Sequence, residues 1–271
     1  MTFTPKLIAL DIDGTLLAPL PDTGYSAEEV SPAVREAIDR AVDAGCHIVL
    51  ASGRAPLSMS WVLERLELPR NGEKAMTVAS NGAVTFSYPP MEVVSEVTFD
   101  AREAVRTVLK EVPEAAVAVE EHGVGYRVNR HFPKGELDGE MILTPIDDLV
   151  AAEVSRVIIR DPESTSEDFV SLAAKLGLHG TNYFIGWTAW LDLAPEGVSK
   201  ASGLAEVAER LGVAQEHVLA IGDGRNDIEM LEWAGRGVAM GQSPDEVKGA
   251  ADSVTATVEE DGAAVEINRW F

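Results

Sequence analysis

A short acidic turn follows the first apolar segment of the chain, and its residue types suit phosphate chemistry. Asp11 and Asp13 come directly after the apolar run 7–10, and Gly14 and Thr15 follow them. A carboxylate can attack a phosphate ester to form an aspartyl phosphate, while a second carboxyl group protonates the leaving oxygen and then deprotonates water. Asp11 and Asp13 could supply both groups, with Gly14 allowing the tight turn. The alternative is that this turn only ends a strand.

A second acidic loop, 222–227, follows another apolar run far along the chain. It carries Asp223, Asn226 and Asp227 beside two glycines. An anionic nucleophile and an anionic ester repel each other, so a cation must lie between them, and carboxylate oxygens are the ligands that Mg²⁺ takes. Asn226 or Asp227 could instead cap the next helix. Capping does not account for all three groups, so we predict a metal site here.

Three shorter motifs gain meaning only if the fold brings them close to Asp11. The Ser52 hydroxyl and the Lys200 ammonium could then hold two oxygens of a transferring phosphoryl group. Taken alone, Ser52-Gly53-Arg54 and Asn81-Gly82 are ordinary turns, and a lysine in the first turn of a helix, such as Lys200, is usually solvated. The motifs are Ser52-Gly53-Arg54, Asn81-Gly82 and Lys200.

The apolar pattern predicts an α/β sheet that would place all these motifs at one edge. Ser31 and Pro32 form a helix start, and strand and helix patterns alternate on either side of it. This order implies a parallel sheet with right-handed crossovers, and ligands bind at the carboxyl ends of such strands. The first three strands are predicted at 7–10, 47–51 and 77–79.

The middle of the chain has a different character. From Val84 onward the strand-like segments are less continuously apolar, which indicates an α+β module with a partly solvated sheet. After Pro195 the α/β pattern resumes. We therefore predict residues 1–83 and 191–271 as two parts of one core domain, with 84–190 inserted. Within the insertion we expect strands at 93–97, 117–119 and 125–128, and helices at 100–112 and near 167–176. In the second part of the core domain we expect strands at 218–221 and 237–240. The helices expected there are at 199–211, 226–234 and 262–271.

Composition narrows the partners that the chain can have. The formal net charge is −23, which argues against nucleic acid or an anionic membrane as a partner. No apolar run is long enough to span a bilayer, the N-terminus lacks a secretory signal, and the single Cys46 cannot form an internal disulfide. We expect a cytoplasmic protein, with Cys46 as a small buried side chain rather than a reactive one. Phosphate binding in so acidic a protein requires concentrated positive charge, which a divalent cation, Lys200 and Arg54 would provide.

The motifs, in this order and spacing, resemble those of the haloacid dehalogenase (HAD) superfamily, and specifically its Cof-type phosphatases with a type IIB cap. The resemblance covers nearly the whole chain. It implies a Rossmann-like core with a parallel sheet, an inserted α+β cap domain of the C2B type, and Mg²⁺-dependent phosphoryl transfer.

The resemblance also implies a role for each matching residue. Asp11 would be the nucleophile and a metal ligand, and Asp13 would be the general acid and base and bind the metal through its backbone carbonyl. Asp223 would be the remaining metal ligand, while Asn226 and Asp227 would orient metal-bound water or Lys200. The residues that would bind phosphate or substrate are Thr15, Ser52, Gly53, Asn81, Gly82 and Lys200.

Two features depart from the family pattern or lie outside it. The segment 18–30 is longer than the usual connection and falls where the family has a flap over the site. Arg225 could reach a second anionic group on the substrate or simply face solvent. Substrate choice should come from the cap, for which the candidates are His122, Tyr126, Arg127, Trp187 and Trp190.

The function that the resemblance implies is a Mg²⁺-dependent phosphatase for small phosphorylated metabolites, with sugar phosphates as the expected class. One alternative is a phosphomutase on the same fold. Another is a non-catalytic protein that binds phosphorylated metabolites, which would be expected if Asp11, Asp13 or Lys200 were replaced. All three are present.

Overall fold

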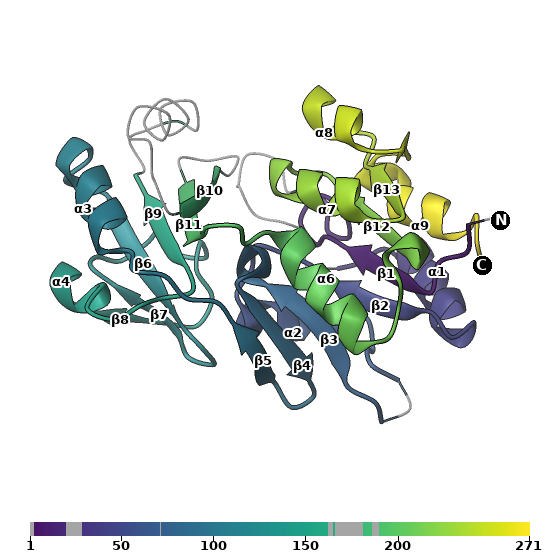
Figure 1. Cartoon of the computed structure of the whole chain (residues 1–271), viewed down its shortest axis with the longest axis horizontal. Coiled ribbons are helices and arrows are strands. Elements are labelled where there is room, and N and C mark those ends of the chain that lie inside the picture. The colour runs from purple at the N-terminus through teal and green to yellow at the C-terminus, as the bar shows by residue number, and fades with distance from the viewer. Residues whose placement is uncertain (1–2, 20–28, 71, 162–164, 166–180, 186–189) are drawn as a thin grey trace.

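The computed structural model describes residues 3–19, 29–70, 72–161, 165, 181–185 and 190–271. In this part of the chain the strands form a five-stranded, a three-stranded and a six-stranded sheet (Figure 1). Both ends of the chain lie beside the five-stranded sheet, and the six-stranded sheet lies at the opposite end of the molecule.

The five-stranded sheet is parallel throughout and has the order β14-β13-β12-β1-β2. The predicted parallel sheet is thereby confirmed for these strands. They are β1 (Leu7–Leu10), β2 (His47–Leu50), β12 (Val218–Gly222), β13 (Arg236–Ala239) and β14 (Ser253–Val254). The accompanying helices are α1 (Pro32–Asp43), α2 (Pro56–Arg65), α6 (Lys200–Arg210), α7 (Ile228–Trp233), α8 (Asp245–Ala250) and α9 (Gly262–Ile267).

Strand β1 is buried on both faces, which explains its uninterrupted apolar sequence. Ile8 and Leu10 pack into a cluster with side chains of α1, α2 and α9. Leu7 and Ala9 point the other way and pack against side chains of α6 and α7. A strand between two helical layers cannot alternate apolar and polar residues, because each face needs an apolar partner.

Helix α1 begins where the sequence predicts. The Ser31 hydroxyl accepts a hydrogen bond from the Val34 backbone N–H at 3.2 Å, and Pro32 occupies the first helical position. The cap satisfies an amide that the helix itself leaves unpaired. The buried face of α1 consists of Val34, Ala37, Ile38 and Ala41, as predicted.

The third predicted strand meets the end of the second in parallel, as expected, and pairs with a further strand on its other edge. β3 (Ala75–Ala79) pairs antiparallel with β4 (Val84–Tyr88), and β4 pairs with β5 (Glu92–Glu96). Among the described residues, β3 joins the parallel sheet through a single bridge between Ala51 and Val78. Because the turn at 80–82 reverses the chain, β4 lies along the edge of β3 opposite to the bridge with Ala51.

The six-stranded sheet forms a second module with the order β10-β11-β9-β6-β7-β8. Its strands are β6 (Ala116–Glu121), β7 (Gly125–Val128), β8 (Glu140–Leu143), β9 (Val157–Arg160), β10 (Thr181–Ile185) and β11 (Trp190–Pro195). Helices α3 (Arg102–Glu111) and α4 (Ile146–Leu149) cover one face, where Val105 and Val108 contribute to an apolar cluster. The other face packs partly on Ala55 of the first module. The helix predicted near 167–176 lies outside the described residues.

The predicted domain boundaries at 83/84 and 190/191 stay predictions. Strand pairing continues across both, because β4 pairs with β3 and β11 pairs with β9. Val84 and Phe86 also pack in the same cluster as β1 and β2. None of the described helices has the length and apolar character needed to cross a membrane.

Phe86→Ala should destabilise the parallel-sheet module, because Phe86 is fully buried in its core cluster. We expect a loss of about 3–5 kcal/mol in the free energy of unfolding, measured by denaturant titration. Val93→Ala on the neighbouring strand is the control, since Val93 is 42% exposed, and it should change stability by about 0.5 kcal/mol or less. Equal effects of the two variants would contradict this packing.

Candidate active site

The motifs predicted from the sequence meet at the carboxyl edge of the parallel sheet. Asp11 directly follows β1, Ser52 lies just beyond β2, and Asp223 follows β12. These three strands are neighbours in the sheet (Figure 1). Lys200 opens helix α6, whose first turn is tied by a hydrogen bond from the Ser199 N–H to the Ser202 hydroxyl at 3.0 Å. Residues nearly two hundred positions apart thereby share one small volume.

Lys200 is the centre of this group. Its ammonium is fully buried and donates to Asp11 Oδ1 at 2.5 Å and to Asp227 Oδ1 at 2.7 Å. Burial alone would lower the pKa of Lys200, but the carboxylates of Asp11 and Asp227 outweigh it and hold the pKa above its ordinary value. Lys200 is therefore a permanent positive charge at this site.

Three buried carboxylates surround this single positive charge. One oxygen from each of Asp11, Asp223 and Asp227 lies within 4.8 Å of the other two. Burial raises the pKa of Asp11 to about 7, and burial together with the neighbouring carboxylates raises that of Asp223 to about 9. The cluster has more negative charge than Lys200 can balance, so its donor set fits a hard divalent cation.

The three carboxylates are not equivalent. Both oxygens of Asp227 already accept hydrogen bonds from the protein. Oδ1 contacts Lys200, and Oδ2 accepts from the backbone N–H groups of Asp223 and Gly224 at 3.0 and 2.9 Å. Asp227 therefore shapes the acidic loop and contacts Lys200, while the role that the resemblance implies for it at a metal site stays a prediction. Asp11 and Asp223 are the carboxylates that would hold an ion.

Gly14 lets the two acidic turns approach each other. Its φ is +85°, and a Cβ at this position would lie 2.2 Å from Asp223 Oδ2. The Gly14 carbonyl accepts a hydrogen bond from Gln242 Nε2 at 2.6 Å, while Gln242 Oε1 accepts from the Val258 N–H at 3.1 Å. Sequence reasoning missed Gln242, because no local motif links it to a turn 228 residues away.

Thr15 and Ser52 are buried beside these carboxylates. The Thr15 hydroxyl has no hydrogen-bond partner in the described part of the chain, although it is 1% exposed. A buried hydroxyl without a partner is costly, so this one fits a ligand oxygen. The Ser52 hydroxyl accepts from the Arg54 N–H at 3.1 Å and keeps its own proton to donate.

Asp13 is separated from the carboxylate cluster. Both of its oxygens accept from Arg54, from Nε at 2.7 Å and from Nη2 at 2.6 Å, and its side chain is 43% exposed. The guanidinium also lies 5.2 Å from the centre of the Trp61 ring. The sequence indicated Arg54 as a nearby positive charge but not as the partner of Asp13.

Asn81 and Gly82 lie between the two modules. Asn81 has a left-handed backbone (φ 54°, ψ 32°), and its Oδ1 accepts from Asn226 Nδ2 at 2.9 Å. A Cβ on Gly53 would lie 3.1 Å from Asn81 Oδ1. Gly82 has a φ of +99° and leaves room for the Ser199 carbonyl, which a Cβ would meet at 2.0 Å. Substrate binding by these residues stays a prediction.

The other candidates from the sequence are spread more widely. His122 contacts Glu120 and Glu96, and Trp190 donates to Asp192. Tyr126 is buried, whereas Arg127 pairs with Glu121. Arg225 is 63% exposed and pairs with Glu246, which agrees with the solvent-facing alternative. Trp187 and positions 20–28 of the long segment 18–30 lie outside the described residues. Cys46 is buried, and burial raises the pKa of its thiol to about 12, so it is unreactive.

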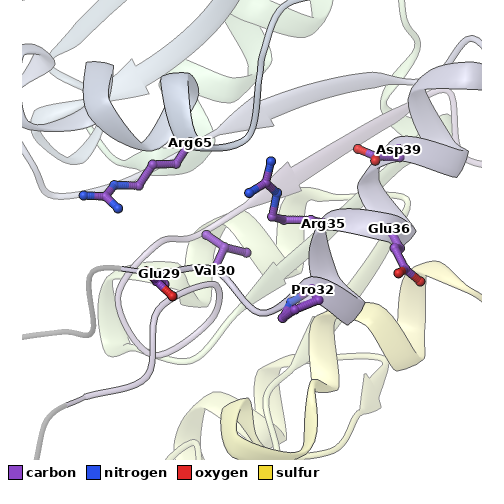
Figure 2. A pocket seen from close by; sticks show the side chains of 7 residues that line it. All are labelled: Glu29, Val30, Pro32, Arg35, Glu36, Asp39 and Arg65. Carbon is purple, nitrogen blue, oxygen red and sulfur yellow. The ribbon is translucent and has the colours of Figure 1, made fainter.

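A separate pocket of about 440 Å³ lies beside helices α1 and α2 (Figure 2). None of the residues that line it belongs to the predicted site. Charges of both signs face it, and Arg65 from this group also lies over Trp61, 4.9 Å from the ring centre. The lining residues are Glu29, Val30, Pro32, Arg35, Glu36, Asp39 and Arg65.

Comparison with known proteins shows which family and which structures this chain resembles. Residues 8–267 match the family model described as haloacid dehalogenase-like hydrolase. A 5-amino-6-(5-phospho-D-ribitylamino)uracil phosphatase of Bacillus subtilis is 30% identical over 98% of this chain and 95% of its own. A phosphoglycolate phosphatase of Natronomonas pharaonis is 31% identical over 97% of this chain and 96% of its own. Among solved structures, a HAD subclass IIB sugar phosphatase has the same fold, with a TM-score of 0.79, 24% identity and 98% coverage of both chains.

Asp223→Asn should stabilise the metal-free protein at about pH 8. With pKa values of about 7 and about 9 against an ordinary 3.8, Asp11 and Asp223 keep protons in the folded state that the unfolded chain has released. The folded state binds more protons across this window, so stability falls as pH rises through it. In thermal unfolding with a chelator, we expect the variant to melt roughly 2–8 °C above wild type at about pH 8, and closer to it at about pH 5.

The same experiment repeated with Mg²⁺ tests the ion site. Mg²⁺ should raise the melting temperature of wild type more at about pH 8 than at about pH 5, because protons compete for the same oxygens. The exposed Asp147→Asn is the control and should behave as wild type. An equal Mg²⁺ effect in Asp223→Asn would contradict the assignment.

Proposed function

The chain belongs to the haloacid dehalogenase-like hydrolases and is a phosphoric monoester hydrolase, and from this premise we propose that it is a Mg²⁺-dependent phosphatase of sugar phosphates and similar small metabolites. The observation that carries the proposal is the contact of Lys200 with Asp11, beside the carboxylate of Asp223. A buried lysine next to a buried carboxylate binds the phosphoryl group where the nucleophile can reach it.

In the first step, an Asp11 carboxylate oxygen forms a bond to phosphorus while the bond from phosphorus to the leaving oxygen breaks. Asp13, once it has left Arg54 and taken up a proton, transfers that proton to the leaving oxygen. The Lys200 ammonium and the Ser52 hydroxyl neutralise charge on the phosphoryl oxygens. The products of this step are the free alcohol and an aspartyl phosphate at Asp11.

In the second step, the Asp13 carboxylate removes a proton from water, and the water oxygen bonds to phosphorus. The bond between Asp11 and phosphorus breaks, which releases inorganic phosphate and restores both aspartates. Asp13 is suited to this role because its side chain is 43% exposed and can reach water.

Asp11 and Asp223, together with the Asp13 backbone carbonyl, would hold the Mg²⁺ ion. The ion supplies positive charge between the anionic nucleophile and the anionic ester. The buried carboxylates of Asp11 and Asp223, with raised pKa values, support this assignment.

The overall charge of the chain favours a neutral leaving group. The buried carboxylates of Glu120 and Asp192 contact Ser80 and Asn81, close to the site. The Arg156 guanidinium donates three hydrogen bonds of 2.8–3.2 Å to the Asp192 carboxylate. Glu120 in turn pairs with His122 at 3.0 Å, so each of the two carboxylates already has a cationic partner. A neutral sugar or polyol is favoured instead by the overall negative charge of the chain, which disfavours a second anionic group on the substrate. One relative is named for a phosphorylated ribityl compound and a structural neighbour is described as a sugar phosphatase, which supports the same class.

Asp11→Asn should abolish turnover of p-nitrophenyl phosphate in the presence of Mg²⁺. The amide is isosteric but a poor nucleophile, so we expect a loss of roughly 10³-fold or more in kcat. The exposed Asp147→Asn should retain the wild-type rate, and both variants should show folded circular dichroism spectra. Turnover by Asp11→Asn at the wild-type rate would refute the nucleophile assignment.

A panel of phosphate esters should show higher kcat/KM for sugar and polyol phosphates than for phosphoglycolate, by roughly tenfold or more, because the formal net charge of −23 disfavours the second anionic group of phosphoglycolate. With glucose 1-phosphate or mannose 1-phosphate, the product should be free phosphate. Formation of the 6-phosphate would establish a mutase, and the absence of turnover with every ester would indicate a binding protein.

A further inference from the structure

Two consecutive residues between the modules have an uncommon backbone. Ser80 and Asn81 have φ values of 50° and 54°, the left-handed region that glycine usually occupies. Both are buried, at 0% and 2% exposure. Such a conformation persists only where the surroundings impose it, and it is concentrated at functional sites.

The second module holds the side chains of this turn. The Ser80 hydroxyl donates to Glu120 Oε2 on β6 at 2.7 Å, and Asn81 Nδ2 donates to Asp192 Oδ2 on β11 at 3.3 Å. The backbone of the turn is tied to the first module, because the Asn81 N–H donates to the Ser52 carbonyl at 3.1 Å. The turn is therefore fixed from both modules.

Asp192 is itself a rigid acceptor. Arg156 donates to both of its oxygens, at 2.8 Å to Oδ2 and at 3.0 Å to Oδ1, and Trp190 Nε1 donates at 2.9 Å. Arg156 and Asp192 are both buried, so neither can turn to water without losing a charged partner. Asp192 is therefore fixed relative to the rest of the second module, so a shift of that module on the first would move Asp192 with it.

The other end of the Asn81 amide reaches the acidic loop. Its Oδ1 accepts from Asn226 Nδ2, and Asn226 precedes Asp227, the partner of Lys200. A continuous series of hydrogen bonds thus runs from Arg156 through Asp192, Asn81 and Asn226 into the loop that carries Asp223.

We propose that Asp192 is a positioning residue for phosphoryl transfer, which fixes Asn81 and, through it, the Asn226 side chain and the acidic loop. This inference rests on the proposed function for its catalytic consequence. The geometry of the ion site then depends on how the second module packs against the first. Residues that hold metal ligands in place without binding the metal affect affinity and rate strongly.

Exchanging the two polar partners tests the proposal. Asn81→Asp keeps an acceptor for Asn226 but places a carboxylate opposite Asp192. It should weaken Mg²⁺ binding, measured by calorimetric titration of the resting protein, and lower kcat, each by roughly tenfold or more. Adding Asp192→Asn reverses the polarity of the bond, since the new amide donates to the new carboxylate, and both losses should be largely restored. In the double variant, the buried Arg156 still has one carboxylate in the same hydrogen-bonded group, the one introduced at position 81.

The exposed Asn268→Asp is the control for an added charge and should leave both quantities unchanged. Thermal unfolding of each variant checks that the chain is folded. Additive losses in the double variant, or Mg²⁺ affinity in Asn81→Asp equal to that of wild type, would overturn the proposal. A loss confined to KM that the exchange does not repair would overturn it in favour of direct substrate contact by Asn81.

If the wild-type protein shows no phosphatase activity, the proposed function fails, while the Mg²⁺ titration still tests the role of Asp192. If the wild type is active and Asn81→Asp leaves the Mg²⁺ affinity unchanged, only the inference about Asp192 fails.

Discussion

The arrangement of the site depends on one electrostatic constraint, the balance of three buried carboxylates around the ammonium of Lys200. Asp11, Asp223 and Asp227 could not share this volume as anions with a single positive charge beside them. Part of the free-energy cost of burying these charges together appears as the raised pKa values of Asp11 and Asp223. A site that is destabilised in this way gains most when a divalent cation and a phosphoryl group bind together, because each supplies the charge that the other lacks.

The fold meets this constraint by bringing together chain segments that are distant in sequence. Parallel strands β1, β2 and β12 end at the same edge and place Asp11, Ser52 and Asp223 there, while the start of helix α6 supplies Lys200. Two glycines make the close approach possible: Gly14 leaves room for Asp223, and a Cβ on Gly222 would lie 2.5 Å from the Asp227 carboxyl carbon. In the described part of the chain, the second module contacts the Ser80–Asn81 turn through Glu120 and Asp192. Choice of substrate by this module stays a prediction.

Local signals in the sequence predicted the elements, and short motifs predicted which residues converge. The buried run of β1, the cap at Ser31 and the helix at 102–111 are all confirmed, because each depends on neighbours within a few residues. The parallel bridge of β3 to the end of β2 agrees with the prediction, but its second partner, β4, was not predicted, since that antiparallel pairing depends on how the turn at 80–82 reverses the chain. The contacts of Asp13 with Arg54 and of Asn81 with Asp192 also escaped prediction. They join positions 41 and 111 residues apart, and only the packed fold brings these side chains together.

The different surroundings of Asp11 and Asp13 bear on the choice between hydrolysis and phosphoryl transfer to a second hydroxyl. The Asp11 side chain is 6% exposed and lies against Lys200, whereas that of Asp13 is 43% exposed and lies against Arg54. A mutase must keep water away from its aspartyl phosphate, and the group that deprotonates the acceptor would then have to be shielded. Here the nucleophile is shielded and the predicted acid and base is open to water. Water can therefore reach the residue that would activate it while the nucleophile stays desolvated, and this division favours hydrolysis.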